Sequence, residues 1–360
     1  MLAARPLVVV IDSHLEERDQ IAAALEPHYR VRDYADVEEA HVRMSGKDPA
    51  VLVVDERNRR RSRGELVHSL RNRFRQVPIV LCGTQVDVDD GADVALIKPF
   101  RRSQLVNAIS SLTNRRIEGS WQDLPNPHPA TLRRTLETFN GLGELLATGE
   151  ELAYQQVVET CDPLVDAVTD SQYKLLLAGI RGHDNLAYVH SLRVATMLAL
   201  FGYHIGLREE PLLILATGGL LHDIGKMSLN QDIIDKPGPL TAEEKAVVRQ
   251  HVDGTIEYLR DHSDVPKGVI TIASQHHERL DGSGYPKGLR GKHLNDLARM
   301  SAIVDVFAAL TEERRHRPAR SPEATFAMMT TEMQGSLDQR LLKMFRDLLL
   351  DAGAASWATA

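Results

Sequence analysis

The chain has 360 residues and a formal net charge of −7, with 43% apolar and 26% charged residues. One ordinary core does not cover this length, so we expect two domains joined by a linker. The acidic balance argues against general nucleic-acid binding, which needs a basic surface, and we expect no DNA partner. The only cysteines, Cys82 and Cys161, exclude a disulfide framework and are typical of buried residues in a reducing compartment.

Hydrophobic runs in the sequence are short. The run nearest the N-terminus, Leu7–Ile11, is too short for a signal peptide, and no stretch approaches the ~18 apolar residues of a membrane span. We therefore predict a cytoplasmic protein with no membrane association.

Four apolar runs alternate with segments of helical periodicity in the first hundred residues. The runs are Leu7–Ile11, Val51–Val54, Ile79–Cys82 and Val94–Ile97, and the helices are expected at about 15–26, 37–45, 64–74 and 101–113. Strands that are apolar throughout are typical of parallel sheets covered on both faces. The pattern predicts an α/β domain with a doubly wound parallel sheet over residues 1–113.

Three charged residues follow these strands: Asp12, Asp55 and Lys98. The carboxyl ends of parallel strands meet at one edge, where two carboxylates can hold magnesium and a lysine can balance a phosphoryl group. The region, roughly 6–113, resembles a response-regulator receiver domain. The resemblance implies that Asp55 is the phosphoacceptor, with Asp12 and Lys98 beside it, and that a sensor kinase or another signalling protein is a partner.

This receiver-like region departs from the family pattern. Ser13 stands where a second acid is usual, and Gly83 stands where a hydroxyl residue is expected. The segment from Gly83 to Lys98 is too short for a full helix, so we expect the fourth helix to be stunted or absent. Two interpretations stay open, a degenerate docking domain and a working phospho-switch. An arginine run after the phosphoacceptor candidate forms either an anion-binding loop or a solvated one: Arg57, Arg59, Arg60, Arg61 and Arg63.

A linker that contains a helix is predicted over residues 114–150. Residues 114–128 are rich in Asn, Pro and Arg and lack periodicity, which indicates a boundary. A helical apolar stripe follows at Leu132, Leu136, Phe139, Leu142 and Leu146. Such a stripe either forms the seam of a homodimer or packs on its own domain.

Polar residues with metal-binding side chains recur in the helical pattern of the second half. They are His190, His222, Asp223, His251, His276, His277 and Asp305. Each lies in a mostly apolar helical segment or beside a tight turn, where burial is costly unless the group is paired or metal-bound. One such residue is usually a satisfied core residue, but this many in one helical domain are better explained by metal ions.

The order and spacing of these residues resemble the HD-GYP branch of the HD phosphohydrolases. The longest matching strings are LLHDIGK at 220–226 and HHERLDGSGYP at 276–286, and the resemblance covers about 171–335. It implies an all-α HD-type phosphohydrolase domain, which we place at 151–360. It also implies two divalent metal ions, iron or manganese, and hydrolysis of cyclic di-GMP to pGpG, with GMP as a further product.

The resemblance also implies a role for each matching residue. The ligands of a binuclear site would be His222, Asp223, His251, His276, His277 and Asp305, with Asp223 as the bridge and His190 as an additional ligand. Lys226 would steady the charge that builds on the phosphate. Gly284, Tyr285 and Pro286 would approach the substrate, and Arg314 would bind phosphate. Two metal ions would generate a hydroxide and hold the phosphate oxygens for in-line attack.

Some positions differ from the family pattern. Leu186 occupies the place where members with three metals carry a glutamate, which favours a binuclear site. Ala308 replaces a common aspartate, and Arg315-His316 replaces the usual Pro-Tyr after Arg314. Three alternatives stay open: a phosphodiesterase for another cyclic dinucleotide such as cyclic GMP-AMP, a non-catalytic cyclic di-GMP sensor, and a response regulator whose output is interaction alone.

Overall fold

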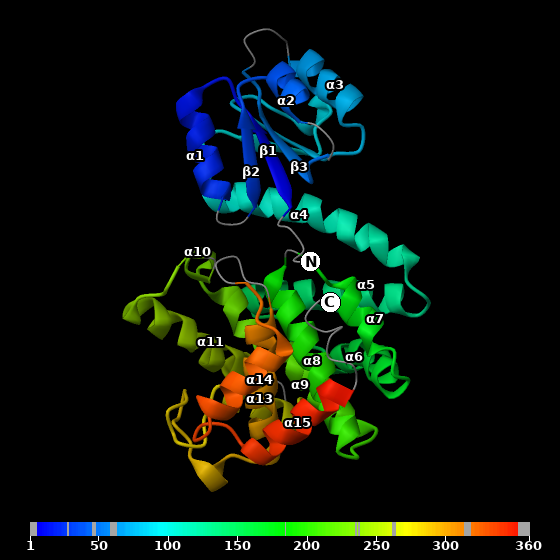
Figure 1. The fold of residues 1–360 in the computed structure, drawn as a ribbon, viewed down its shortest axis with the longest axis vertical. Coiled ribbons are helices and arrows are strands. Elements are labelled where there is room, and N and C mark those ends of the chain that lie inside the picture. The colour runs from blue at the N-terminus through cyan, green and yellow to red at the C-terminus, as the bar shows by residue number, and fades with distance from the viewer. Residues whose placement is uncertain are drawn as a thin grey trace. The chain divides into compact units, whose positions relative to one another are not determined.

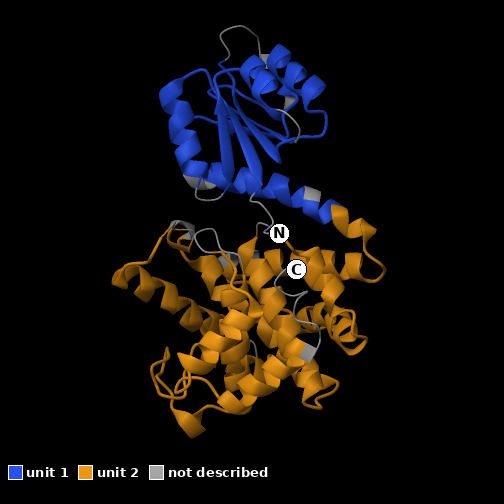
Figure 2. Cartoon of the chain, in the orientation of Figure 1, with its two compact units in different colours: residues 1–119, 182–184 blue, residues 120–181, 185–360 orange. Residues whose placement is uncertain are grey.

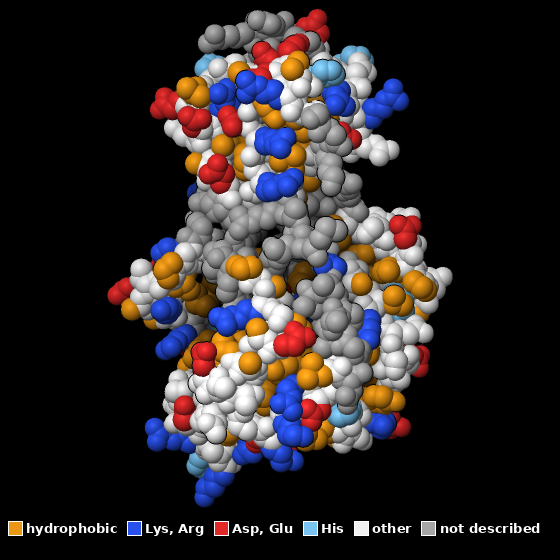
Figure 3. Space-filling model, in the orientation of Figure 1, with side chains coloured by type: hydrophobic (Ala, Val, Ile, Leu, Met, Phe, Trp, Pro, Cys, Tyr) orange, Lys and Arg blue, Asp and Glu red, His pale blue; other side chains and the backbone are white. Residues whose placement is uncertain are grey.

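The computed structural model describes the following residues: 6–26, 29–44, 48–57, 63–183, 185–234, 236, 238–260, 264–312 and 318–351. The chain divides into two compact units, drawn in different colours in Figure 2. Unit 1 contains residues 1–119 and 182–184, and unit 2 contains residues 120–181 and 185–360. On the face shown in Figure 3, acidic and basic side chains are interspersed on each unit.

Unit 1 is a five-stranded sheet with helices on both faces (Figure 1). The strands are β1 (Leu7–Ile11), β2 (Arg30–Tyr34), β3 (Val51–Asp55), β4 (Ile79–Gly83) and β5 (Val94–Ile97). All neighbouring pairs are parallel, in the order β2-β1-β3-β4-β5. This is the flavodoxin-like order, which receiver domains share. The prediction of a doubly wound α/β fold is confirmed.

Separate apolar cores lie on the two faces of this sheet because the central strands are apolar on both sides. The helices are α1 (Leu15–Leu25), α2 (Val37–Arg43), α3 (Arg63–Arg73) and α4 (Arg102–Ser120). Helices α2 and α3 pack on one face, and α1 and α4 pack on the other. Because the strands are parallel, the carboxyl ends of β1, β3 and β5 lie at one edge of the sheet, as the sequence predicts.

Two features of the sheet differ from a regular alternation. Strand β2, with the sequence RVRDY, was not predicted, because an edge strand with mostly exposed side chains has no apolar run. Between β4 and β5 the chain forms only the short 3-10 turn η1 (Val88–Asp90). The predicted loss of the fourth helix is thus confirmed, and β5 stays partly exposed, with Ile97 62% exposed.

The regular elements that the structure describes in unit 2 are helices, joined by turns and loops with one isolated bridge between Asp281 and Arg290. Its elements are η2 (Trp121–Asp123), α5 (His128–Thr148), α6 (Tyr154–Thr169), α7 (Tyr173–Gly179), α8 (Leu186–His204), α9 (Glu210–Leu221), η3 (Ile224–Ser228), α10 (Gln231–Ile234), α11 (Ala242–Arg260), α12 (Lys267–Gln275), η4 (Gly291–His293), α13 (Asp296–Thr311), α14 (Pro322–Thr331) and α15 (Gln339–Asp351). Helices α8 and α9 lie at the centre, packed against α6, α12 and α13. Among the described helices, none is both long and apolar enough to cross a membrane.

The segment between the two sequence patterns is more ordered than predicted. Helix α4 continues to Ser120, although its last two turns carry mostly polar residues that give no apolar periodicity. Helix α5 buries Leu132, Leu136, Phe139 and Leu142 in the core of unit 2, with Leu146 packed against that core. Residues 120–150 therefore belong to unit 2 instead of a linker, and the apolar stripe packs on its own domain instead of forming a dimer seam.

Candidate metal centre

The histidines and aspartates predicted as ligands come together in the middle of unit 2. Helix α8 carries His190, and His222 and Asp223 directly follow the end of α9. Helix α11 carries His251, and His276 directly follows the end of α12. His277 follows directly, and α13 contributes Asp305. All of these residues are buried except His277, which is partly exposed.

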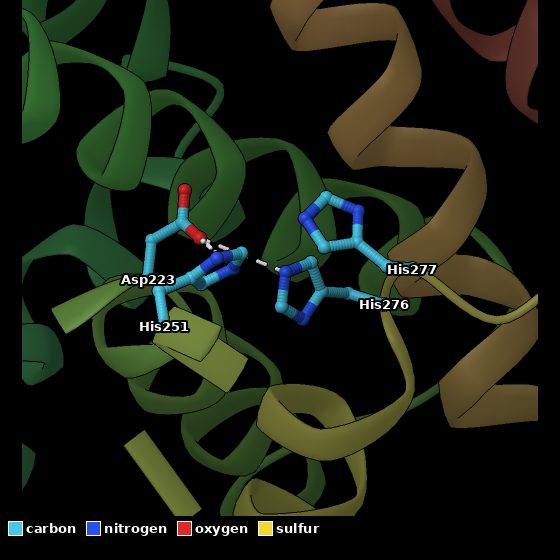
Figure 4. A group of neighbouring side chains, drawn as sticks. All are labelled: Asp223, His251, His276 and His277. Atoms are coloured by element: carbon cyan, nitrogen blue, oxygen red, sulfur yellow. Dashed lines mark ion pairs between the residues drawn. The ribbon is translucent and has the colours of Figure 1, made fainter. Parts of the chain in front are cut away.

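The side chains form two adjoining groups of candidate ligands. Within each group the candidate ligand atoms lie within 4.8 Å of one another. One group contains Asp223, His251, His276 and His277, and the other contains His190, His222 and Asp305. Figure 4 shows the first group, with the carboxylate of Asp223 and the rings of His251 and His276 turned toward one another.

The carboxylate of Asp223 faces both groups. Its Oδ1 lies 3.0 Å from Nε2 of His251 and 3.6 Å from Nε2 of His276. Its Oδ2 lies 3.4 Å from Nε2 of His222 and 3.7 Å from Nε2 of His190. Because each oxygen points at a different set of imidazoles, the residue has the placement of a bridging carboxylate.

Asp305 also faces both groups. Its Oδ1 lies 3.1 Å from Nε2 of His190 and 3.9 Å from Nε2 of His222. Its Oδ2 lies 3.5 Å from Nδ1 of His277. Two carboxylates thus lie among five imidazoles, in a buried volume where each charge needs a partner.

The backbone fixes the orientation of three of the rings. Nδ1 of His222, His251 and His276 lies 2.7, 2.6 and 2.9 Å from the carbonyl oxygen three residues earlier in each helix. Nδ1–H therefore donates, and the lone pair of Nε2 points into the centre. Each of these Nε2 atoms is buried without a hydrogen-bond partner among the described residues. Such a set of inward lone pairs and carboxylates fits a pair of divalent transition-metal ions.

Electrostatics keep the carboxylates charged. Burial raises the pKa of Asp223, but Lys226 and His222 outweigh burial and hold that pKa well below its ordinary value. Burial raises the pKa of Asp305 too, but the hydrogen bond from His190 outweighs burial and holds that pKa well below its ordinary value. Both side chains are thus in the anionic form that binds a cation.

The imidazoles differ from one another in their protonation. Burial lowers the pKa of His276 to about 4, and burial together with His276 holds the pKa of His277 well below its ordinary value. Burial also acts to lower the pKa of His190, but Asp305 and Glu312 outweigh it and raise that pKa to about 9. Two rings are therefore neutral, while the third carries a proton that a metal ion would replace.

Lys226 lies at the edge of the centre on η3. Its ammonium group hydrogen-bonds Oδ2 of Asp223, one turn earlier in the chain. The side chain is 23% exposed, so it lies between the buried ligands and solvent. This position suits two roles for Lys226. The residue can form a salt bridge to Asp223, and it can place a cation beside a bound phosphate.

The loop at 284–286 is held against the ligands. The amide of Tyr285 donates to the carbonyl of His277 at 3.2 Å, and the two rings lie 4.6 Å apart. A Cβ on Gly284 would lie 2.5 Å from the backbone of His277 and its neighbours, so only glycine fits. Pro286 follows Tyr285 through a cis peptide bond. The predicted loop therefore borders the centre.

Two further residues of this region were not predicted from the sequence. Glu278 is buried and accepts hydrogen bonds from the amides of Lys287 (2.8 Å) and Leu289 (2.9 Å), which ties the loop to the ligand segment. Arg249 places its guanidinium group 4.8 Å from the ring centre of Tyr285. Its position two residues before His251 was the available signal, since one helix carries both residues.

A family model described as an HD domain matches residues 178–341. That segment contains all of the candidate ligands in the two groups of unit 2. Residues 178–341 form an HD domain. The predicted resemblance and the prediction of an all-α HD-type domain are confirmed.

Two proteins similar to this chain are named as phosphodiesterases for different cyclic dinucleotides. It is 32% identical over 197 residues to a cyclic di-GMP phosphodiesterase of Pseudomonas aeruginosa, a match that covers 53% of this chain and 47% of the relative. It is 36% identical over 159 residues to 3'3'-cGAMP-specific phosphodiesterase 1 of Vibrio cholerae, covering 44% of this chain and 37% of the relative. The chain thus spans less than half the length of these two relatives.

A third relative matches both units. The chain is 27% identical over 347 residues to the cyclic di-GMP phosphodiesterase response regulator RpfG of Xanthomonas campestris pv. campestris. This match covers 92% of the chain and 85% of the relative. The match to this named response regulator therefore extends over both the α/β unit and the HD domain of the chain.

The departures predicted within the HD domain are only partly visible. Leu186 is half-buried at the start of α8, after Asn185, whose side chain caps the helix by accepting from the amide of Tyr188. Ala308 is fully buried on α13. Arg314, with Arg315 and His316, lies outside the described residues.

The predicted receiver residues also come together. At the carboxyl edge of the sheet in unit 1, Nζ of Lys98 lies 2.5 Å from Oδ2 of Asp55. Asp12 and Asp55 form, with His14, a group whose oxygen and nitrogen atoms lie within 4.8 Å of one another. These three side chains are close enough together to bind one cation. Asp12 accepts from the amide of His14 at 2.8 Å.

Side chains that were not predicted to belong to this site surround it. Arg57 hydrogen-bonds both Asp55 and Glu17, and Lys98 bonds Glu17 as well. A Cβ at Gly83 would lie 2.3 Å from the carboxyl carbon of Glu56, so the Glu56 side chain fills the space of the expected hydroxyl residue. Of the other arginines in the run that was predicted to bind an anion or stay solvated, Arg59–Arg61 lie outside the described residues, and Arg63 is the first residue of α3.

Proposed function

We propose that the HD domain is a metal-dependent phosphodiesterase that hydrolyses cyclic di-GMP to pGpG, under the control of the receiver-like unit. The observation that carries the proposal is the carboxylate of Asp223, whose two oxygens face different groups of buried imidazoles. This arrangement suits two adjacent cations, and paired cations are the usual means of cleaving a phosphodiester. The substrate is supported by two relatives that are named cyclic di-GMP phosphodiesterases.

The ligands proposed for the two ions are His222, Asp223, His251, His276, His277 and Asp305, with His190 as an additional ligand. Bound divalent ions, which we propose to be iron or manganese, would supply Lewis acidity at the phosphate and lower the pKa of a nearby water. The chain's own residues hold these ligands rigidly, since three of the rings are fixed by the carbonyls of their own helices. A rigid polar centre pays little reorganisation during the reaction.

Other residues would bind and orient the substrate. Lys226, already drawn toward the centre by Asp223, is placed to stabilise negative charge that builds on the phosphate. Tyr285, whose ring is tilted against that of His277 and lies near the guanidinium group of Arg249, is proposed to contact a base with its aromatic face. Gly284 and Pro286 keep that face beside the ligands, and Arg314 is proposed as a further phosphate contact.

A second substrate is favoured by one specific observation. The chain is 36% identical over 159 residues to a protein named as a 3'3'-cGAMP-specific phosphodiesterase. Cyclic GMP-AMP differs from cyclic di-GMP in one base only, so the same metal centre could cleave both. We propose cyclic di-GMP as the preferred substrate, because the relative that covers most of the chain is named for it.

The test is reconstitution of metal-stripped protein with manganese or iron, followed by chromatography of the products. Cyclic di-GMP and cyclic GMP-AMP are offered separately and then together. We expect pGpG to form first, only after metal is restored, and faster than the product from cyclic GMP-AMP. Cleavage at an unchanged rate by metal-stripped protein would refute the proposal, and so would binding of the dinucleotide without cleavage by metal-loaded protein, since that is the behaviour of a sensor.

The setting of this activity is also proposed. The response-regulator name of the relative that matches both units supports a signalling protein, such as a sensor kinase, as the partner of unit 1. A cytoplasmic location agrees with a nucleotide substrate and with two buried free cysteines. Phosphorylation of purified protein by candidate kinases, with hydrolysis as the readout, would test the link between the units.

A further inference from the structure

Glu312 lies beside the metal centre although no sequence pattern singles it out. It follows the last residue of α13, is 4% exposed, and places Oε2 3.4 Å from Nδ1 of His190. Asp305, about two turns earlier on the same face of α13, lies 3.1 Å from Nε2 of the same ring. The imidazole of His190 therefore has carboxylates on both sides, with Glu312 at Nδ1 and both Asp305 and Asp223 at Nε2.

The other helix-borne rings of the centre are held differently. Nδ1 of His222, His251 and His276 bonds a carbonyl of its own helix. Within the described residues, Nδ1 of His190 makes no such backbone bond and faces Glu312 instead. The carboxylate thus stands where the backbone carbonyl stands for the other three rings.

The backbone around Glu312 is fixed to α8. Arg193, one turn after His190, donates from Nη2 to the hydroxyl of Thr311 at 2.9 Å. Thr311 in turn donates to the carbonyl of Phe307 at 2.8 Å, which closes the last turn of α13. These bonds hold the residue before Glu312 against the helix that carries His190, so the approach of the two side chains is a feature of the packed core.

We propose that Glu312 is a positioning residue for the metal ion of the His190–His222–Asp305 group, which accepts Nδ1–H of His190 and keeps Nε2 directed at the ion. An approach of a few tenths of an ångström would bring the pair to ordinary hydrogen-bond length. A carboxylate behind an imidazole ligand fixes the ring and strengthens its donor nitrogen. The inference rests on the proposed metal-dependent function, but it concerns only one of the two ions.

The geometry explains why Glu312 should affect only one of the two ions. Glu312 contacts His190, which belongs to one group of ligands, whereas His251, His276 and His277 belong to the other. Loss of the carboxylate should therefore lower the affinity for one ion and leave the affinity for the other unchanged. Removal of such a supporting residue typically reduces metal affinity on the order of 10–100-fold.

The experiment is a titration of metal-stripped full-length protein with Mn²⁺, with free Mn²⁺ measured by electron paramagnetic resonance. The wild type is expected to bind two equivalents tightly. Glu312→Gln, which keeps the side-chain size, should bind one equivalent as before and the second on the order of 10–100-fold more weakly. Glu312→Asp should restore part of the lost affinity. Glu323→Gln, an exposed glutamate in the first turn of α14, is the matched control and should bind as the wild type does.

Several results would overturn the inference. They are two equally tight equivalents in Glu312→Gln, an equal loss at both sites, and a fall in the thermal midpoint of the metal-free protein with unchanged affinities. The last result would show a purely structural role. Because no measurement uses a nucleotide, wild-type protein that binds two ions but cleaves nothing would refute the proposed function and leave this inference standing.

Discussion

The guanidinium group of Arg57 lies against the carboxylate of Asp55, with Nε 3.0 Å from Oδ1. Lys98 holds the other oxygen at 2.5 Å, and both cations also bond Glu17. Burial raises the pKa of Asp55, but the hydrogen bonds from Arg57 and Lys98 outweigh burial and lower it. The predicted phosphoacceptor is thus already paired at both oxygens, and a magnesium ion or phosphoryl donor must displace a cation.

This network predicts that Asp55 is a poor phosphoacceptor. Acetyl phosphate with magnesium should label the wild type weakly, as intact-protein mass spectrometry would show. Arg57→Ala removes the guanidinium group from Oδ1 of Asp55 and leaves only the backbone amide of residue 57 as its donor. It should therefore increase the labelled fraction several-fold, while Asp55→Asn should abolish any label. Stoichiometric labelling of the wild type that depends on Asp55 would show instead that unit 1 is a working phospho-switch.

A second prediction separates metal binding from charge stabilisation in the HD domain. His222→Ala or Asp223→Ala should reduce metal content and abolish hydrolysis, with the helical circular dichroism signal retained. Lys226→Met should keep the full metal content and lose on the order of 100-fold in kcat, because its ammonium group acts on developing charge. Metal analysis beside kinetics distinguishes the two. Loss of metal from Lys226→Met would mean that the lysine serves only to hold Asp223.

Much of the candidate metal centre could be predicted from sequence for two reasons. Its candidate ligands are polar residues in otherwise apolar helical segments, and their order and spacing resemble a known family pattern. His190, His222 and Asp305 all stand out in that way. Glu312 and Glu17 do not, since an isolated glutamate in a polar stretch reads as a solvated residue. Their contacts arise only when helices far apart in sequence pack together, as α8 does with α13.

The fold shows the same division. The buried strands β1, β3 and β4 are apolar runs, and their sheet and its edge could be predicted with Asp12 and Asp55 in place. Strand β2 and the end of α4 were missed because both carry mostly polar side chains. Hydrogen bonding to a neighbouring strand, which local sequence does not record, makes β2 a strand.

A third prediction concerns the loop at 284–286. A Cβ on Gly284 would meet the backbone at 2.5 Å, so Gly284→Ala should displace Tyr285 without removing a ligand. We expect unchanged metal content and a KM for cyclic di-GMP raised at least tenfold. Gly141→Ala is the control, since nothing lies within 4 Å of its Cβ and a helical alanine stabilises slightly. Normal kinetics in Gly284→Ala would remove the loop from substrate binding.

The two cysteines provide a fourth prediction, on stability. Burial raises the pKa of both Cys82 and Cys161 to about 12, so neither thiol should react with a disulfide reagent in folded protein at mildly alkaline pH. Cys82 lies in the core of unit 1 and Cys161 in that of unit 2. In rising urea, Mn²⁺ should delay labelling of Cys161, because an ion at 100 times its Kd stabilises a folded domain by about 2.7 kcal/mol. Labelling of Cys82 should not change. Equal protection of both thiols would show that the two units unfold together.

The last prediction concerns the number of metal ions, and it turns on Leu186. This residue begins α8, one turn before His190, and its side chain cannot bind a cation. The carboxylates that reach His190 are instead Asp305 and Asp223, on its Nε2 side, and Glu312, on its Nδ1 side. Asp305 and Asp223 already face both ligand groups, so a third ion at Nε2 would lack an anionic ligand of its own, and a hard cation depends on such ligands.

A binuclear centre should therefore release chiefly pGpG, because a second cleavage must hold a linear substrate with an additional phosphate charge. Leu186→Glu should raise metal content and the GMP fraction together, and Leu186→Gln, which adds a side chain of the same size without charge, should raise neither. Anomalous scattering at the metal edge would count the ions, and chromatography would follow the products. Three fully occupied ions in the wild type, or GMP as its main early product, would contradict the binuclear assignment. In that case Glu312 would be the first residue to examine as a direct ligand, since its carboxylate is the one that reaches His190 from outside the two ligand groups.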